Sequence, residues 1–209
     1  MTNIAPFGSL PLAKGSIQYL VESQVNALLF AFQHWYDSAP TEAKRRIWGR
    51  YWLTFLVLRF TGARIGEVLL IDDKTDIDFR QAEIRLVTLK RHSPQKKSHT
   101  RIVPVPANVI AEIATYIAQF PQQRGRIFKL QQSNFRNCFY KRAKEANIPR
   151  DLAHPHILRH TRAIELLRAG VPVTIVQDLL GHSALTTTAI YLRISGQEAR
   201  GILREKGLI

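Results

Sequence analysis

The segment PHILRHTRAIELLRAGVPVTIVQDLLGHSALTTTAIYL, from Pro155 to Leu192, carries most of the information about the fold. Apolar residues recur along it at helical spacing, and Gly170 and Gly181 stand where helix C-termini are expected. The pattern predicts three consecutive helices, over residues 155–169, 173–180 and 184–192. Histidine, arginine and tyrosine side chains accompany these helices, so the same segment also raises the question of function.

Helical spacing dominates the rest of the chain as well. Further helices are predicted from residue 17 to the break at Pro40, with Ser23 as N-cap, and over residues 42–60, 65–70, 107–120, 133–147, with Ser133 as N-cap, and 197–206. Residues 1–16 contain prolines and glycines without any periodic pattern, and they are expected to form an N-terminal tail or linker stub.

One part of the chain favours β structure. Residues 83–89 and 101–105 are two short strand-like runs, separated by a basic loop, which predicts a hairpin. Pro104 and Pro106 restrict the second run to the edge of a sheet or to the end of its strand. We therefore expect a mainly α fold with a small antiparallel β-sheet (α+β). It would form one domain over residues 17–209, with a C-terminal tail helix at about 195–209.

Charge points to an anionic partner. The 209 residues include 30 Lys and Arg against 16 Asp and Glu, which gives a formal net charge of +14. Self-repulsion of this size is costly unless a polyanion offsets it, so nucleic acid is the expected partner. The alternative is a soluble protein that is basic for other reasons, since net charge alone says little about partners.

The single cysteine, Cys138, excludes an internal disulfide and fits a reducing compartment. We expect it to pack as a small apolar residue and not to act as a nucleophile. Residues 1–14 lack the pattern of a signal peptide, and the apolar run at 51–60 is too short to cross a bilayer and is interrupted by Arg59. The expected location is the cytoplasm, in association with the nucleoid and without a membrane anchor.

Cutting a DNA strand without a metal ion would make definite demands on side chains. The transition state concentrates negative charge on the phosphate, so fixed cations are needed beside its oxygens. Arginine suits this role because its planar fork donates two parallel hydrogen bonds and keeps its proton. Histidine and lysine suit proton transfer, and a further group must act as nucleophile.

The run TGARIGEV at residues 61–68 places Arg64 between the end of one helix and the start of the next. Free N–H groups at such a helix start could join Arg64 in holding a phosphate. Glu67 lies three residues later, within reach of Arg64 on the same turn, and could orient it. The alternative is an ordinary Arg–Glu pair on the surface.

The run HILRHT places His156, Arg159 and His160 on one helix face, because they are three and four residues apart. Together they offer a cation for phosphate and an imidazole for proton transfer. A zinc site made of His154, His156 and His160 is the alternative. It is disfavoured because no carboxylate or cysteine is interleaved and because Arg159 would place a positive charge beside the ion.

The run LLGHS exposes His182 just after a helix-ending glycine, and Tyr191 follows nine positions later. A phenol has an ordinary pKa of about 10, so it becomes a nucleophile only in a cationic neighbourhood. The arginines and histidines above could provide one. The alternative is a tyrosine that packs in the core of an amphipathic helix.

These runs, in this order, resemble the tyrosine recombinase (phage integrase) family. TGARIGEV is similar to the family's first box, T-G-x-R-x-x-E followed by Leu, Ile or Val. The segment from His156 to Tyr191 is similar to the second box, H-x-L-R-H-T, then L-L-G-H, then T-x-x-x-Y. The resemblance covers about residues 19–194 and implies the catalytic-domain fold of that family.

The resemblance implies site-specific cleavage and rejoining of double-stranded DNA, in integration, excision or inversion. Arg64 and Arg159 would hold the scissile phosphate, and His156 would act in proton transfer. His182 would support the phosphate, and Tyr191 would attack it, forming a 3′-phosphotyrosyl bond and releasing a 5′-hydroxyl. The ester conserves the bond energy, so no metal, ATP or other cofactor is implied.

The family also uses a lysine of the β-hairpin to protonate the leaving 5′-oxygen. It precedes an R-x-x-P run on the return strand, which Arg101 to Pro104 matches here. Lys90 is the first choice because it ends the first strand, and Lys96 and Lys97 are the other candidates. The alternative is that all three lysines contact the DNA backbone without taking part in chemistry.

The sequence departs from the family pattern at three places that remove no catalytic group: Gly66, Ile157 and Arg162. Many relatives carry a DNA-clamping domain ahead of this one. Here about 16 residues precede the first predicted helix, so the chain resembles short recombinases that invert promoter segments, or a truncated gene.

The resemblance implies a homo-tetramer on DNA, a monomer or dimer without it, and accessory DNA-bending proteins. The 18 residues after Tyr191 would dock on a neighbouring subunit through Ile202, Leu203 and Leu208, or alternatively fold back on their own core. Two rival functions share these residues or this fold: a type IB topoisomerase and a DNA-binding regulator that no longer cleaves.

Overall fold

The computed structural model describes residues 18–88, 99–181, 204 and 207. Its helices are α1 (Glu22–Asp37), α2 (Glu42–Thr61), α3 (Ile65–Val68), α4 (Ala107–Gln119), α5 (Gln132–Glu145), α6 (His156–Arg168) and α7 (Val173–Leu180), with a 3-10 turn at Pro121–Gln123. Its strands are β1 (Ile77–Asp78), β2 (Glu83–Thr88) and β3 (His99–Pro104). The expected mainly α fold with a small antiparallel sheet is confirmed.

The three strands form one antiparallel sheet in the order β1-β2-β3. Glu83 lies opposite Pro104 and Thr88 opposite His99, so β2 and β3 form the predicted hairpin. β3 is an edge strand, which is where a strand that ends in proline belongs. β1 was not predicted, because two residues are too short to show a sequence pattern.

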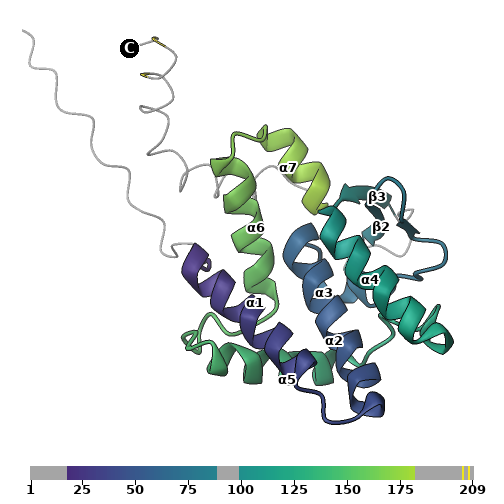
Figure 1. The fold of residues 1–209 in the computed structure, drawn as a ribbon. Coiled ribbons are helices and arrows are strands. Elements are labelled where there is room, and N and C mark those ends of the chain that lie inside the picture. Colours follow the sequence, from purple (N-terminus) through teal and green to yellow (C-terminus); the bar gives the residue numbers. More distant parts are fainter. Residues whose placement is uncertain (1–17, 89–98, 182–203, 205–206, 208–209) are drawn as a thin grey trace, which may run out of the picture.

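The core is built around α2, which contacts α1, α4 and α6. Its buried side chains include Phe55, whose ring stacks on Phe32 of α1 with 4.1 Å between centroids. Phe135 and Phe139 of α5 extend this aromatic cluster. In Figure 1, α5 lies at the end of the molecule opposite the sheet, and α7 lies beside β3.

Two predicted N-caps are wrong. Ser23 lies inside α1, which begins after Val21, and the Val21 N–H donates to the side chain of Gln24 at 3.1 Å. Ser133 likewise lies inside α5, whose N-cap is Gln131. In both places the chain enters the helix earlier than the serine, so the serine hydroxyl is not in the capping position.

The predicted glycine stops are confirmed. Gly62 and Gly181 are the C-caps of α2 and α7, with φ of 64° and 67°, and Gly170 follows α6 with φ of 79°. Both C-cap glycines lie where elements meet: a Cβ on Gly62 would be 2.5 Å from Leu180 of α7, and a Cβ on Gly181 would be 2.8 Å from Arg101 of β3. Within the described residues, no helix has the length and apolar character needed to cross a membrane.

Candidate active site

The turn between α2 and α3 is the centre of the candidate site. The Thr61 hydroxyl donates to the Val57 carbonyl at 2.6 Å and accepts the Ala63 N–H at 3.1 Å. Gly62 then reverses the chain in the left-handed conformation, and Arg64 is the N-cap of α3. The sequence TGAR therefore builds a rigid turn that presents Arg64 at the start of a new helix.

Glu67 binds Arg64 twice. Its Oε1 accepts the Arg64 Nη1 at 3.0 Å, and its Oε2 accepts the Arg64 backbone N–H at 3.1 Å. The Arg64 side chain is 39% exposed, whereas that of Glu67 is fully buried. The alternative of a simple surface pair is thus wrong, because the glutamate is buried. The Arg64 guanidinium is held by this buried carboxylate and remains accessible to solvent.

Arg159 joins α6 to the same turn. Its Nη1 donates to the Gly62 carbonyl at 2.9 Å, across 97 residues of chain, and the residue is only 2% exposed. The second sequence box is therefore brought against the first, as predicted. Gly62, which Arg159 contacts, stands two positions before Arg64 in the chain.

His156 opens α6 one turn before Arg159, and its ring meets that of His160 edge to face at 4.7 Å. Desolvation by the surrounding protein, together with electrostatic interactions with His160, Arg159, His154 and Arg64, lowers the pKa of His156 to about 4. A neutral imidazole at pH 7 follows.

The zinc alternative receives no support. Among residues 18–88 and 99–181, no three His, Cys, Asp or Glu side chains are grouped in a way that could hold a metal ion. Burial also lowers the pKa of His160 to about 4, with His154 and Arg159 contributing. Both imidazoles are neutral at pH 7 beside a buried guanidinium.

Arg101 of β3 is a further member of the site that the sequence analysis treated only as part of the R-x-x-P match. Its Nη2 donates to Glu67 Oε2 at 2.7 Å, its Nη1 to Thr88 Oγ1 at 2.8 Å and its Nε to the Leu179 carbonyl at 2.8 Å. Strand alternation could have placed it, because Arg101 shares the buried face of β3 with Val103.

The carboxylate of Glu67 is the electrostatic link between the two arginines. Burial alone would raise its pKa, but the hydrogen bond and charge of Arg101, together with the N–H and charge of Arg64, hold the pKa below its ordinary value. Glu67 is therefore ionised at neutral pH and holds a cation on each side.

Of the six predicted catalytic residues, the structure brings Arg64, His156 and Arg159 together around the α2–α3 turn. The other three, Lys90, His182 and Tyr191, lie outside the described residues, as do the alternatives Lys96 and Lys97. The described chain reaches Thr88, the last residue of β2, and Gly181, the C-cap of α7, and both adjoin Arg101.

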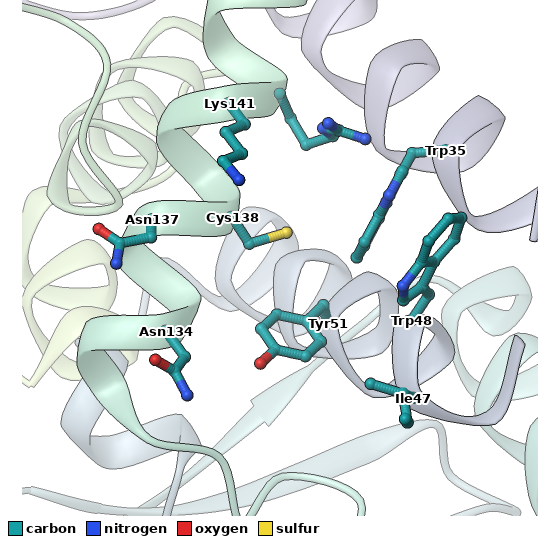
Figure 2. A pocket seen from close by; sticks show the side chains of 9 residues that line it. Trp35, Ile47, Trp48, Tyr51, Asn134, Asn137, Cys138 and Lys141 are labelled. Atoms are coloured by element: carbon teal, nitrogen blue, oxygen red, sulfur yellow. The ribbon is translucent and has the colours of Figure 1, made fainter. Parts of the chain in front are cut away.

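A separate hollow of about 380 Å³ lies between α1, α2 and α5, where Figure 2 shows the rings of Trp35, Trp48 and Tyr51 facing side chains of α5. Cys138 lines it, and burial raises the pKa of this thiol to about 12. The thiol therefore stays protonated, in agreement with the prediction that Cys138 is not a nucleophile.

Comparison with known proteins decides the family. The model of the phage integrase family matches residues 18–198, which is most of the chain and includes every predicted catalytic residue. The chain belongs to the phage integrase family.

Individual relatives agree with this membership. A tyrosine recombinase of Thermosipho africanus is 32% identical over 185 residues, which cover 86% of this chain and 58% of the relative. The chain thus spans little more than half the length of the curated recombinases that it matches.

Solved recombinases share the fold. The crystal structure of XerA recombinase matches with a TM-score of 0.69 at 22% identity, over 95% of this integrase-family chain and 66% of XerA. A pre-cleavage complex of the XerH site-specific recombinase with its difH substrate matches with a TM-score of 0.68 at 20% identity, over 88% of this chain and 52% of XerH.

Proposed function

We propose that residues 17–209 form the catalytic domain of a site-specific recombinase, which cleaves and rejoins double-stranded DNA through a 3′-phosphotyrosyl intermediate. The observation that carries the proposal is the meeting of the two sequence boxes: Arg159 binds the Gly62 carbonyl, beside the Glu67-anchored Arg64 and a neutral His156. Family membership supports this chemistry, and the XerH complex illustrates a DNA substrate on the same fold.

In the proposed reaction, Arg64 and Arg159 bind the non-bridging oxygens of the scissile phosphate and stabilise the charge that grows on them. Arg159 is buried without DNA, so its contact with phosphate requires a local opening when the duplex binds. Anchoring by Glu67 fixes the orientation of Arg64 in advance, which lowers the cost of organising the site.

The covalent step exchanges one ester for another. The Tyr191 oxygen forms a bond to phosphorus and the bond from phosphorus to the 5′-oxygen breaks. The phenol proton passes to neutral His156, and Lys90 supplies a proton to the leaving 5′-oxygen. His182 supports the phosphate. Attack by a 5′-hydroxyl reverses the step, so rejoining requires no cofactor.

Exchange between two duplexes breaks four strands, so we also propose that four copies act together on DNA. Accessory DNA-bending proteins and association with the nucleoid belong to the same proposal.

Covalent capture tests the proposed function. The full chain is incubated with a pool of nicked duplexes of randomised sequence, in which the short cleaved strand diffuses away and traps the adduct. Adducts that survive denaturation are recovered and their DNA is amplified and sequenced. We expect enrichment of one site by the wild-type protein, and no enrichment if the chain only binds DNA.

Variants then assign the nucleophile. On the captured site, Tyr191→Phe should form no adduct yet still bind DNA, because phosphate contacts supply most of the affinity. Tyr140→Phe, which changes an exposed tyrosine of α5, is the matched control and should react like wild type. Arg159→Lys should lose most cleavage, since an ammonium does not reproduce the planar fork. Equal adduct yields from Tyr191→Phe and wild type would reject the assignment.

A further inference from the structure

The guanidinium of Arg101 is a buried cation with several hydrogen bonds, and the proposed reaction gives it no role. It lies in β3 with its side chain 6% exposed, and all three of its nitrogens donate hydrogen bonds of 2.7–2.8 Å. The acceptors come from three different elements: Glu67 in α3, Thr88 at the end of β2, and the Leu179 carbonyl in the last turn of α7.

Each of these acceptors is next to a residue of the proposed reaction. Glu67 holds Arg64 through the carboxylate that also binds Arg101. Thr88 is the last residue of β2 and stands two positions before Lys90, and Leu179 stands three positions before His182. The Arg101 side chain thus joins three segments of the chain, and each of these segments contains or precedes a proposed reactive residue outside α6.

Gly181 gives independent evidence that this junction is tightly built. A Cβ at Gly181 would lie 2.8 Å from Arg101 Nη1, 3.0 Å from its Cζ and 3.0 Å from Thr88 Oγ1. Only a residue without a side chain lets the end of α7 approach so closely, and its φ of 67° also favours glycine.

Arginine is suited to such a junction and lysine is not. The guanidinium directs its N–H groups outward in one plane at fixed angles, so three acceptors on different elements can be held at once. A lysine side chain carries a single nitrogen, which cannot lie within hydrogen-bond distance of all three acceptors in this arrangement. The geometry at Arg101 therefore serves orientation more than charge alone.

We propose that Arg101 is a positioning residue, which locks the ends of β2 and α7 to α3 and, through Glu67, sets the orientation of Arg64 toward the scissile phosphate. This inference rests on the proposed function. All three nitrogens of Arg101 are engaged by acceptors of the protein, so it acts on the rate of cleavage through Arg64 and not on the binding of DNA.

The test compares single-turnover adduct formation by Arg101→Lys and wild type on the captured site, with duplex affinity and thermal unfolding measured in parallel. We expect the cleavage rate to fall by about 100-fold, which is typical of small misplacements in an active site, while affinity stays within about twofold. Arg85→Lys is the matched control: Arg85 lies on β2 and pairs with Asp76, away from this junction, and should cleave like wild type.

A double-mutant cycle distinguishes positioning from general damage. If Arg101 acts through Arg64, the Arg64→Lys/Arg101→Lys variant should cleave little more slowly than Arg64→Lys alone, because the second change removes an effect that is already lost. If Arg101 only stabilises the fold, the two losses should multiply.

Thr88→Val provides a milder variant in case Arg101→Lys unfolds. It removes one acceptor but leaves the Arg101–Glu67 pair intact, and a several-fold slower cleavage is expected. Wild-type cleavage by folded Arg101→Lys or by folded Thr88→Val overturns the inference, as do multiplying losses in the cycle. Failure of the wild-type chain to form any adduct would instead reject the proposed function.

Discussion

Two arginine–glutamate pairs with the same i,i+3 spacing differ greatly in their surroundings. In α3, Glu67 is fully buried and serves Arg64 and Arg101 together. In α5, the side chain of Glu145 is 50% exposed and pairs with Arg142. Spacing predicts both contacts equally well, but only the buried carboxylate leaves uncompensated charge in the interior when it is removed.

This contrast leads to a stability prediction. Glu67→Gln should lower the free energy of unfolding by about 3 kcal/mol, because breaking a buried ion pair from one side leaves an unpaired charge. Glu145→Gln should change it by no more than about 0.5 kcal/mol, as expected for a pair on a helix surface. Urea unfolding at pH 7 measures both, and similar losses in the two variants would contradict the prediction.

The lowered pKa of His156 makes a prediction about pH. Since the folded chain disfavours the protonated ring, the unfolded chain binds that proton more readily, and the free energy of unfolding falls as pH drops from about 6.5 toward about 4. Above about 6.5, His156 contributes no pH dependence. A bound phosphate should raise the pKa, because an anion favours the imidazolium.

Proton NMR titration of the imidazole, assigned with His156→Gln, measures this pKa directly. We expect a value well below 6.5 in the free protein and a higher value with duplex bound. A free-protein pKa above 6.5, or a decrease on adding DNA, would contradict the prediction.

At the residue scale, the sequence predicted the candidate catalytic residues better than the residue that positions them. Arg64, His156 and Arg159 were identified because their spacing on or beside helices can be read from the chain. The role of Arg101 was not identified, because arginine is rarely buried. Its three acceptors lie 13, 34 and 78 residues away, and no local sequence pattern predicts them.

At the element scale, glycine and proline made most helix ends predictable. The prediction for α7 matches the observed Val173–Leu180, and α2 ends at Gly62 as expected, since these residues act through local backbone geometry. The two serine caps failed because each helix begins before its serine, with N-caps at Val21 and Gln131. At α1, Gln24 accepts the Val21 N–H instead.

Packing between elements depends on a contact that the sequence did not reveal. Gly49 lies inside α2, where a glycine normally weakens a helix, yet a Cβ there would lie 2.4 Å from Tyr116 Cε2 of α4 and 3.1 Å from Tyr36 Cε2 of α1. Tyr116 is buried and donates to the Arg46 carbonyl at 2.6 Å, so its ring has little room to move. The glycine is therefore expected to serve close packing.

Gly49→Ala should accordingly lower the free energy of unfolding by about 1–2 kcal/mol. Overpacking costs about 1–3 kcal/mol, while the better helix propensity of alanine returns up to about 1 kcal/mol. In a cycle measured by urea unfolding, Tyr116→Leu should reduce the penalty of Gly49→Ala. A stabilising Gly49→Ala would show that propensity, and not contact with Tyr116, controls this position.

At the scale of the whole molecule, the excess of positive charge cannot be compensated internally. With 30 Lys and Arg against 16 Asp and Glu, the formal net charge is +14, and the acidic side chains of the chain cannot neutralise this excess. Buried cations such as Arg101 are already engaged with the protein, so the unpaired excess must lie mostly at the surface. A polyanion would relieve its self-repulsion.

Salt dependence tests this directly. Binding of the Tyr191→Phe protein to a duplex, followed by fluorescence anisotropy, should weaken linearly in log–log form with a slope steeper than about −3, because each neutralised phosphate of a duplex contributes about −0.9 through released counterions. A single strand of equal length should give a shallower slope at the same number of contacts, since each phosphate then contributes about −0.7. A slope near zero on the duplex would mean that the surplus cations do not face DNA, and it would remove the electrostatic basis for duplex binding.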